Sequence, residues 1–221
     1  MSYAKRRIIK EIRQMRFFGI DSPLYKFMTT LLNVFLLSFC VVIGSLPIVT
    51  VGASVVAGFS VGLRMVANEE GYIVRQFFKA YKENLKQGIP LGLIALLCAY
   101  VIYLDTEIVS KVENVSIFAI MFMMVSAAVF TFTLLYSFAL TARYENTLMR
   151  ILKNSFRISM KFFVRTLALV FLLVLEVLAF LWNYTTIFIG IILGPALMIL
   201  TVCLFARPIF MKLEGDAASG E

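Results

Sequence analysis

The sequence contains no histidine, one tryptophan and only three cysteines among its 221 residues. Histidine is the commonest general base and the commonest metal ligand, so its absence removes the residue on which many catalytic and metal sites depend. The cysteines, Cys40, Cys98 and Cys203, lie far apart inside apolar runs and without CxxC spacing. We interpret them as small buried hydrophobic residues rather than disulfide partners or ligands. The sequence therefore predicts no metal site and no cofactor.

Recognisable catalytic motifs are also missing from the chain. It has no GxxxxGKS or GxxxxGKT phosphate-binding loop, no HExxH and no GxSxG. The EAA-type cytoplasmic loop of ATP-driven importer permeases is not found either. A membrane enzyme of envelope polymer synthesis would usually present His, Asp or Arg clusters near the membrane surface, and we find no such pattern. We expect a protein that is not an enzyme, and we predict no catalytic residue.

Charged residues make up only 15% of the chain, whereas hydrophobic residues make up 61% and the mean hydropathy is +0.92. A soluble domain could not cover so much apolar side chain without large exposed apolar patches. Lipid is the environment in which such a surface is stable. The composition therefore predicts an integral membrane protein.

The net charge of +8 is explained by the placement of the basic residues. Apart from Lys111, they fall in four clusters beside long apolar runs, at residues 5–26, 64–86, 143–165 and 207–212. Lys and Arg beside spans mark cytoplasmic segments and contact lipid headgroups. This pattern favours contact with the lipid bilayer over nucleic-acid binding. It predicts a multi-pass membrane protein with both termini in the cytoplasm.

The apolar runs predict six transmembrane helices, since about 20 mainly apolar residues cross the hydrocarbon core. The expected spans are residues 24–44, 48–66, 88–104, 115–142 and 166–182, with a sixth ending near residue 205. Residues 105–114 are expected to form an outer loop, and residues 183–186 a short outer turn. The chain thus divides into a basic cytoplasmic segment (1–23), one six-helix domain (24–206) and a cytoplasmic tail (207–221).

Two segments between spans have the pattern of amphipathic helices at the membrane surface. In the first, Val74, Phe77, Phe78, Tyr81 and Leu85 recur at helical spacing opposite Arg75, Lys79, Lys82, Glu83 and Lys86. In the second, Leu148, Leu152, Ser155, Phe156 and Ser159 oppose Arg150, Lys153, Arg157 and Lys161. We predict two cytoplasmic interfacial helices in addition to the six spans, in an all-α fold.

These two segments also resemble each other at a shift of 75 residues. The shift places Arg75 on Arg150 and Tyr81 on Phe156. Each unit is a span, a basic surface helix and a second span, so the predicted internal repeat is parallel. Such repeats occur in membrane carriers and also where duplication has simply built a helix bundle, and both possibilities stay open.

Three motifs carry a family resemblance. Residues 45–52 (SLPIVTVG), residues 69–84 with EEGY and FFKAYKEN, and residues 138–146 (FALTARYEN) occur in order along the chain. They resemble the SLPxxTxG turn, the EEGY…FFxAFKxN segment and the second cytoplasmic entry of the bacterial YesL family of predicted membrane proteins. The molecular function of that family is unknown, and its members are often encoded beside ATP-driven sugar importers. The resemblance implies a partner among carbohydrate importers but carries no catalytic residues.

Glu176 is the most informative polar residue, because it lies inside an apolar span. A carboxylate there costs at least about 2.5–3.5 kcal/mol on insertion scales, so we expect it to face the interior of the bundle. It is a candidate proton, cation or substrate site, with Asn33 and Ser137 as candidate neighbours. The alternative is a protonated Glu176 that forms a hydrogen bond with a Ser or Thr of a neighbouring helix.

Other polar and small residues have simpler interpretations. Arg64 is expected to reach the headgroups or to pair with Glu69 or Glu70. Glu69, Glu70 and Glu145 are expected to cap the surface helices, or alternatively to dock a basic partner. Small residues at 58 and 62 have GxxxG spacing, which favours close helix packing. Gly194-Pro195 predicts a kink or a break in span six.

The function that these features favour is a non-enzymatic accessory or assembly subunit of a membrane complex. Its partners would be the permease subunits of a carbohydrate ABC-type uptake system, and a homo-oligomer is also possible. The residues expected to dock the partner are Phe77, Phe78, Tyr81, Lys82, Leu152, Phe156 and Arg157. The alternative is an autonomous small-molecule transporter that uses the repeat interface and Glu176.

Overall fold

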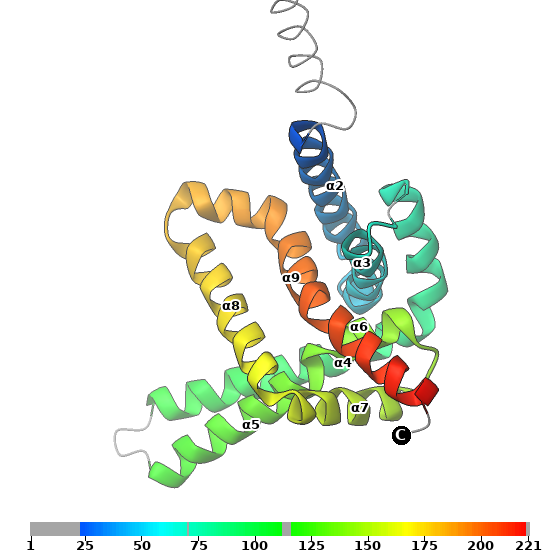
Figure 1. The fold of residues 1–221 in the computed structure, drawn as a ribbon. Coiled ribbons are helices and arrows are strands. Elements are labelled where there is room, and N and C mark those ends of the chain that lie inside the picture. The colour runs from blue at the N-terminus through cyan, green and yellow to red at the C-terminus, as the bar shows by residue number, and fades with distance from the viewer. Residues whose placement is uncertain (1–22, 70, 112–115, 220–221) are drawn as a thin grey trace, which may run out of the picture.

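The structure is a computed structural model that describes residues 23–69, 71–111 and 116–219 (Figure 1). All regular elements of this part of the chain are helical, which confirms the predicted all-α fold. They are α2 (Pro23–Gly44), the 3-10 helix η1 (Ile48–Thr50), α3 (Val51–Val66), α4 (Ile73–Lys111), α5 (Ile117–Leu135), α6 (Ser137–Arg143), α7 (Leu148–Lys161), α8 (Phe163–Leu181) and α9 (Tyr184–Ser219). The predicted basic segment 1–23 lies outside the described residues except for Pro23.

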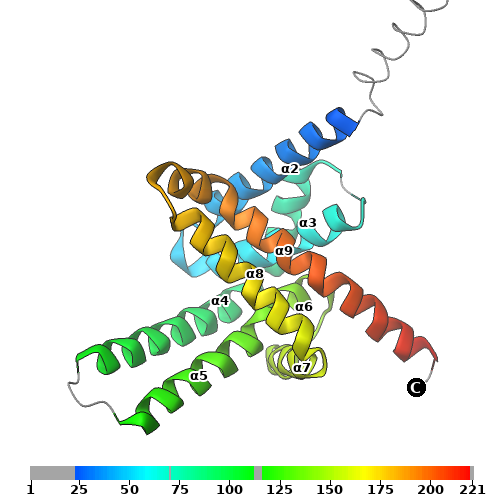
Figure 2. The same cartoon turned by 60° about the vertical axis from the view of Figure 1, so that its left-hand side comes forward.

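Within the described ranges, six segments are long and apolar enough to cross a membrane, as predicted. They are Leu24–Gly44, Ile48–Val66, Ile73–Lys111, Ile117–Arg143, Phe163–Leu181 and Tyr184–Gly215. In Figure 2 the α8–α9 connection lies to the left, while the C-terminal end and the connection between α6 and α7 lie to the right. Arg64 and Arg143 lie in the last turns of α3 and α6, and they line one pocket together with Arg207 of α9. The end of the molecule with this pocket is here named the basic end.

Helix α3 is the centre of the packing, because glycines on two of its faces let neighbouring helices approach closely. A Cβ added to Gly52 would lie 2.1 Å from the carbonyl oxygen of Gly88 in α4, and one added to Gly92 would lie 2.6 Å from the Cα of Gly52. On another face, a Cβ on Gly58 would lie 2.7 Å from Ile199 of α9. In the most apolar stretch of this span 61% of the residues are buried, so α3 is covered by protein rather than lipid.

Hydrogen bonds close the turn between α2 and α3, where the sequence predicted a break. The Ser54 hydroxyl donates to the carbonyl of Val41 at 2.8 Å, and the Thr50 hydroxyl donates to that of Gly44 at 3.1 Å. These hydroxyls donate to carbonyls in the last turn of α2, where the backbone hydrogen bonds of the helix run out. Tyr81 of α4 also donates to Gly44, at 3.4 Å.

The first amphipathic segment differs from expectation, because it is continuous with the third span in α4 rather than a separate surface helix. The helix continues through Pro90, and the predicted outer loop is helical up to Lys111. An ion pair between Glu107 and Lys111, one helical turn apart, supports this last turn. At about 1.5 Å per residue, the 39 residues of α4 extend about 58 Å.

The second amphipathic segment forms a helix of its own, α7, as predicted. It begins after an extended stretch from Tyr144 to Thr147 and ends at Phe162, whose φ of −112° and ψ of 43° leave the helical region. Figure 2 views α7 nearly end on, so it lies across the direction of the spans. Its first residue follows that of α4 by 75 positions, the shift of the predicted repeat.

Two further differences concern spans four and six. The fourth span is divided at Tyr136 into α5 and α6. Helix α9 runs without interruption through Pro195 and Pro208 to Ser219, so the predicted boundary of the tail at residue 207 lies inside a helix. Figure 1 shows α9 changing direction in its orange section, in agreement with the predicted kink rather than a break.

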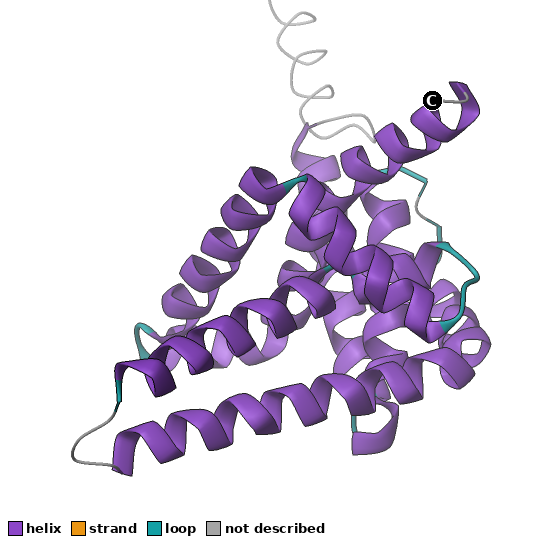
Figure 3. Ribbon diagram, turned by 90° about the horizontal axis from the view of Figure 1, so that it is seen from below, coloured by secondary structure: helices purple, strands orange, loops and turns teal. Residues whose placement is uncertain are grey.

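The distal part of α4 (residues 93–111) and α5 project from the other helices, and this pair is named the arm (Figures 2 and 3). Ser126 of α5 donates a hydrogen bond of 3.1 Å to Asp105 of α4 and joins the two helices. None of the residues in the most apolar stretch of Ile117–Arg143 is buried. The arm therefore presents its side chains to lipid or to another protein.

Candidate functional site at the basic end

An ion pair at the basic end ties α6 to α9. Arg143 donates from Nε and Nη2 to the two carboxylate oxygens of Glu214, both at 2.9 Å, in the bidentate geometry that suits a guanidinium. The Tyr144 hydroxyl donates to the same carboxylate. The rings of Tyr144 and Phe210 meet edge to face with centroids 5.8 Å apart.

Burial raises the pKa of Tyr144 to about 12, and its hydrogen bond to the negative Glu214 acts in the same direction. The phenol is therefore neutral at physiological pH and serves as a hydrogen-bond donor. Arg143, Tyr144 and Glu214 are thus held together by hydrogen bonds, and this group lies between the two pockets described next.

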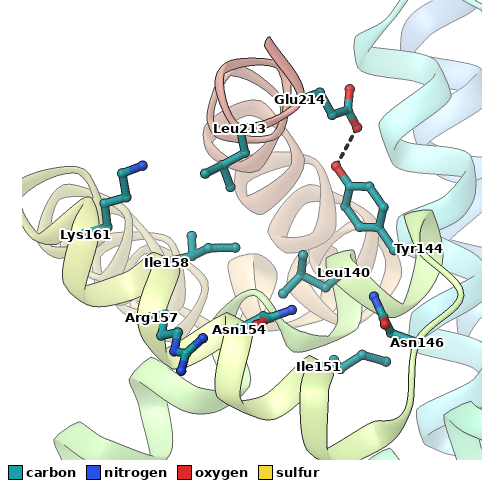
Figure 4. Close-up of a pocket in the computed structure, with 10 residues that line it drawn as sticks. All are labelled: Leu140, Tyr144, Asn146, Ile151, Asn154, Arg157, Ile158, Lys161, Leu213 and Glu214. Carbon is teal, nitrogen blue, oxygen red and sulfur yellow. Dashed lines mark hydrogen bonds between the residues drawn. The ribbon is translucent and has the colours of Figure 1, made fainter. Parts of the chain in front are cut away.

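The first pocket lies between α6, α7 and α9 and has a volume of about 440 Å³ (Figure 4). Apolar side chains from three helices form part of its wall, and polar side chains from α7, α9 and the α6–α7 connection form the rest. Its lining residues are Leu140, Tyr144, Asn146, Ile151, Asn154, Arg157, Ile158, Lys161, Leu213 and Glu214. In Figure 4 the Tyr144–Glu214 hydrogen bond closes one side of it.

The second pocket, of about 420 Å³, lies on the other side of Arg143 and is named the arginine pocket. It is lined by Ser60, Leu63, Arg64, Ala67, Glu69, Ala142, Arg143, Arg207 and Met211. Arg64 comes from the last turn of α3, Arg143 from the last turn of α6, and Arg207 from the C-terminal half of α9. Arg207 donates from Nη1 to the carbonyl of Val66 at 3.1 Å.

The packing of α3 on α9 explains how these arginines meet. Gly58 lies against Ile199, and Gly62 lies against Cys203. In both pairs the two residues are separated in the sequence by the same number of positions as Val66 and Arg207, which are joined by a hydrogen bond. The three contacts follow one another at four-residue steps, so the two helices run parallel in one register. Small residues at 58 and 62 therefore place Arg207 at the end of α3.

A third, shallower depression of about 330 Å³ lies between α5 and α7 and is named the α5–α7 groove. It is lined by Val129, Thr133, Leu152, Lys153, Phe156 and Arg157. It brings together Leu152, Phe156 and Arg157, three of the predicted docking residues.

The other predicted docking residues, on α4, do not share this surface. Phe77 is fully buried in the core, so its side chain offers nothing to a partner in this structure. Tyr81 is half-buried and donates to Gly44. Phe78 and Lys82 are exposed. The helical spacing was predicted correctly, but the more apolar face of the segment packs on α2 and α3 rather than on the membrane surface.

Glu176 is partly buried and accepts a hydrogen bond of 3.3 Å from Thr201 of α9. The predicted neighbours are elsewhere. Ser137 is buried and donates to Leu134 at 2.7 Å, and Asn33 lies half-buried on α2. No hydrogen bond among the described residues joins Glu176, Asn33 and Ser137. Thr201 was missed, although a threonine inside an apolar span is a signal that could have identified it.

The remaining polar predictions have different outcomes. Arg64 forms no ion pair with Glu69 in the described part of the chain, and Glu70 lies outside it. The N-cap of α7 is Thr147, whose side chain forms no capping hydrogen bond, and Glu145 lies two residues before it. Across the described ranges, no group of three Cys, Asp or Glu side chains is placed to hold a metal.

One comparison with known proteins finds a relationship over part of the chain. Residues 29–106 match the model of the family DUF624. DUF624 is described as a protein family of unknown function. No curated protein and no solved structure shows a significant match to the chain.

The DUF624 match covers most of α2, all of α3 and α4 up to residue 106, less than half of the chain. It includes the turn at residues 45–47 and the close contact of Gly52 with α4. Of the three arginines of the arginine pocket, Arg64 lies within the DUF624 match, whereas Arg143 and Arg207 lie beyond it.

Proposed function

We propose that this chain is a non-enzymatic accessory or assembly subunit of a membrane complex, and that its partner is the permease of a carbohydrate ABC-type importer. It would lie in a bacterial cell membrane with both termini in the cytoplasm. The observation that supports this proposal most directly is the arm, whose apolar surface has few neighbours within the chain.

The arm offers a continuous apolar stripe along α5. Phe118, Phe122, Val125 and Val129 follow one another at helical spacing, and the first three are 78%, 70% and 60% exposed. The stripe leads into the α5–α7 groove, where Leu152 and Phe156 continue it.

Apolar exposure alone does not indicate a partner in lipid, because lipid tails are as apolar as these side chains. Helices associate there through close packing and hydrogen bonds. A stripe that ends in a groove provides the complementary shape that close packing needs. Met121, Met123 and Met124 lie beside it, and methionine adapts readily to different surfaces.

The identity of the partner rests on the family resemblance. The motifs resemble those of the YesL family, whose members are encoded beside sugar importers, and the DUF624 match is compatible with that name. The positions of the basic clusters support cytoplasmic termini, because Lys and Arg remain on the cytoplasmic side.

A second candidate function, an autonomous small-molecule transporter, is favoured by one observation. The Glu176–Thr201 hydrogen bond places an ionisable group between two spans, where such groups often bind protons or substrates. A purified transporter would bind or move a solute by itself, whereas an accessory subunit would not.

The proposal is tested by purifying the tagged chain in mild detergent from its native host and identifying co-purifying proteins by mass spectrometry. We expect importer permease subunits in stoichiometric amount. Isolation of the chain alone, as a monomer or a homodimer, would contradict the proposal.

Matched variants test the docking surface separately. Phe118→Ala with Phe122→Ala removes two large side chains from the stripe but keeps α5 apolar, so insertion is preserved. Phe171→Ala with Leu175→Ala makes a similar change on α8, where these residues are 63% and 45% exposed. We expect only the α5 pair to lose the permease. Equal retention by both pairs would show that the stripe is not the docking surface.

A further inference from the structure

The arginine pocket has the donors and the charge of an anion site. Three guanidinium groups, from Arg64, Arg143 and Arg207, line one volume of about 420 Å³. A guanidinium is always charged and presents its N–H donors in a planar fork that matches the oxygens of a phosphate. Such sites are built where arginines from separate elements converge.

The partners of these groups within the chain leave donors free. Arg143 uses Nε and Nη2 on Glu214, and Arg207 uses Nη1 on the carbonyl of Val66. The guanidinium of Arg64 forms no hydrogen bond or ion pair with any residue that the structure describes, and the side chain is exposed. Each arginine has five N–H donors, so all three can still bind a ligand.

The charge balance of the pocket is positive. Glu69 is the acidic residue of its lining, and it is exposed and lies in no ion pair with a described residue. Even when Glu69 and the Glu214 bound to Arg143 are both counted, one guanidinium charge is in excess.

The rest of the lining suits an anion that is attached to an organic group. Ser60 contributes a hydroxyl, while Leu63, Ala142 and Met211 contribute apolar surface. The volume exceeds that of a phosphate ion and falls in the range of small-molecule pockets. The pocket also lies where α3, α6 and α9 approach the basic end, the level at which basic pockets between spans meet lipid headgroups.

We propose that the arginine pocket binds the phosphate group of an anionic lipid headgroup or of a phosphorylated solute. Arg64 is the residue that gains most from the ligand, because its guanidinium has no partner among the described residues. Arg143 and Arg207 are held in place by their bonds to Glu214 and Val66 and so present a preformed part of the site.

The experiment measures thermal unfolding of the purified full chain with two kinds of probe. One is a mixed micelle with phosphatidylglycerol, compared with phosphatidylcholine at the same total lipid. The other is inorganic phosphate, compared with chloride at equal ionic strength. We expect a saturable rise in Tm. A rise with phosphatidylglycerol alone identifies a lipid headgroup, and a rise with inorganic phosphate identifies a free phosphorylated solute.

Variants decide whether the pocket is responsible. Arg64→Gln removes the free guanidinium without breaking a hydrogen bond of the described chain, and we expect the affinity to fall about tenfold to a hundredfold. Arg150→Gln, on the exposed side of α7, removes the same charge and should bind as the unchanged chain does. The proposal is overturned if neither probe raises Tm, or if Arg64→Gln binds as tightly as Arg150→Gln.

Discussion

Glu176 and Thr201 join two spans through side chains, in a region where most neighbouring residues are apolar. Thr201 donates to the carboxylate oxygen at 3.3 Å, and Gln would present an oxygen at the same position without an ionisable proton. We expect Glu176→Gln to leave the thermal stability nearly unchanged. Thr201→Val removes the donor and should destabilise the chain by about 0.6 kcal/mol, the average for hydrogen bonds between membrane helices.

The two variants distinguish a structural role from a functional one. Thermal unfolding in detergent measures their stability, and solute binding to the purified chain measures activity. If Glu176→Gln abolished a solute signal while its Tm remained that of the unchanged chain, the carboxylate would be a binding group and the transporter alternative would gain support. A large loss of stability in Glu176→Gln would contradict the hydrogen-bond account.

Tyr144 gives a prediction about pH. Its folded pKa of about 12 lies above the ordinary value of 10.0, so the folded chain holds the proton more tightly than the unfolded chain. The stability due to this phenol is complete below pH 10 and is lost as the pH rises from about 10 to about 12. In a spectroscopic titration of tyrosinate, the difference between the unchanged chain and Tyr144→Phe should show one phenol that titrates near pH 12.

Glu214 supplies the control for this titration. Glu214→Gln removes the negative charge but leaves the phenol partly buried, so the pKa of Tyr144 should fall toward 10.0 without reaching it. An unchanged titration in Glu214→Gln would show that the carboxylate does not act on Tyr144.

At the scale of elements, the contact of α3 with α4 depends on glycines. Because a Cβ on Gly92 would lie 2.6 Å from the backbone of Gly52, no side-chain movement relieves the overlap and the helices must separate. We expect Gly92→Ala to destabilise the chain by about 1–3 kcal/mol, the usual range for overpacking, in chemical or thermal unfolding. Gly215→Ala is the control, because a Cβ there meets nothing within 4 Å. Equal effects of the two changes would refute this account.

The elements show which features the sequence could predict. Apolar length identified the six spans, and helical spacing identified the amphipathic pattern of α7. The continuity of α4 was missed, because the two amphipathic segments have the same basic pattern but end differently. The segment in α7 is followed by a break at Phe162, whereas the segment in α4 continues as helix through Gly88. Gly88 belongs to the contact with α3, and a contact between distant residues is not readable from local pattern.

At the scale of the whole molecule, the arginine pocket illustrates what only the fold reveals. Arg64, Arg143 and Arg207 belong to three different basic clusters, each of which predicted a cytoplasmic flank by itself. Their convergence requires α9 to lie against α3 in one register, and this register depends on Gly58 and Gly62. The GxxxG spacing predicted close packing at these glycines, but no local pattern identifies Ile199 and Cys203 as their partners.

The orientation of the molecule in the membrane is the last prediction. Lys111 ends α4 at one end of the spans, whereas Lys153 on α7 and Lys212 on α9 belong to the basic end. If the basic end faces the cytoplasm, a membrane-impermeant maleimide should label Lys111→Cys in intact cells. It should label Lys153→Cys and Lys212→Cys only after permeabilisation.

The background for this labelling replaces the three native cysteines by alanine. Cys40 and Cys203 are buried and Cys98 is partly exposed, so the thiol at Cys98 is the one whose removal matters most for specific labelling. Labelling of Lys153→Cys in intact cells would show that the orientation is the reverse of the predicted one. It would also place the arginine pocket on the outer surface, where cytoplasmic phosphorylated solutes could not reach it. The same experiment thus restricts the source of the phosphate group as well as the direction of the chain.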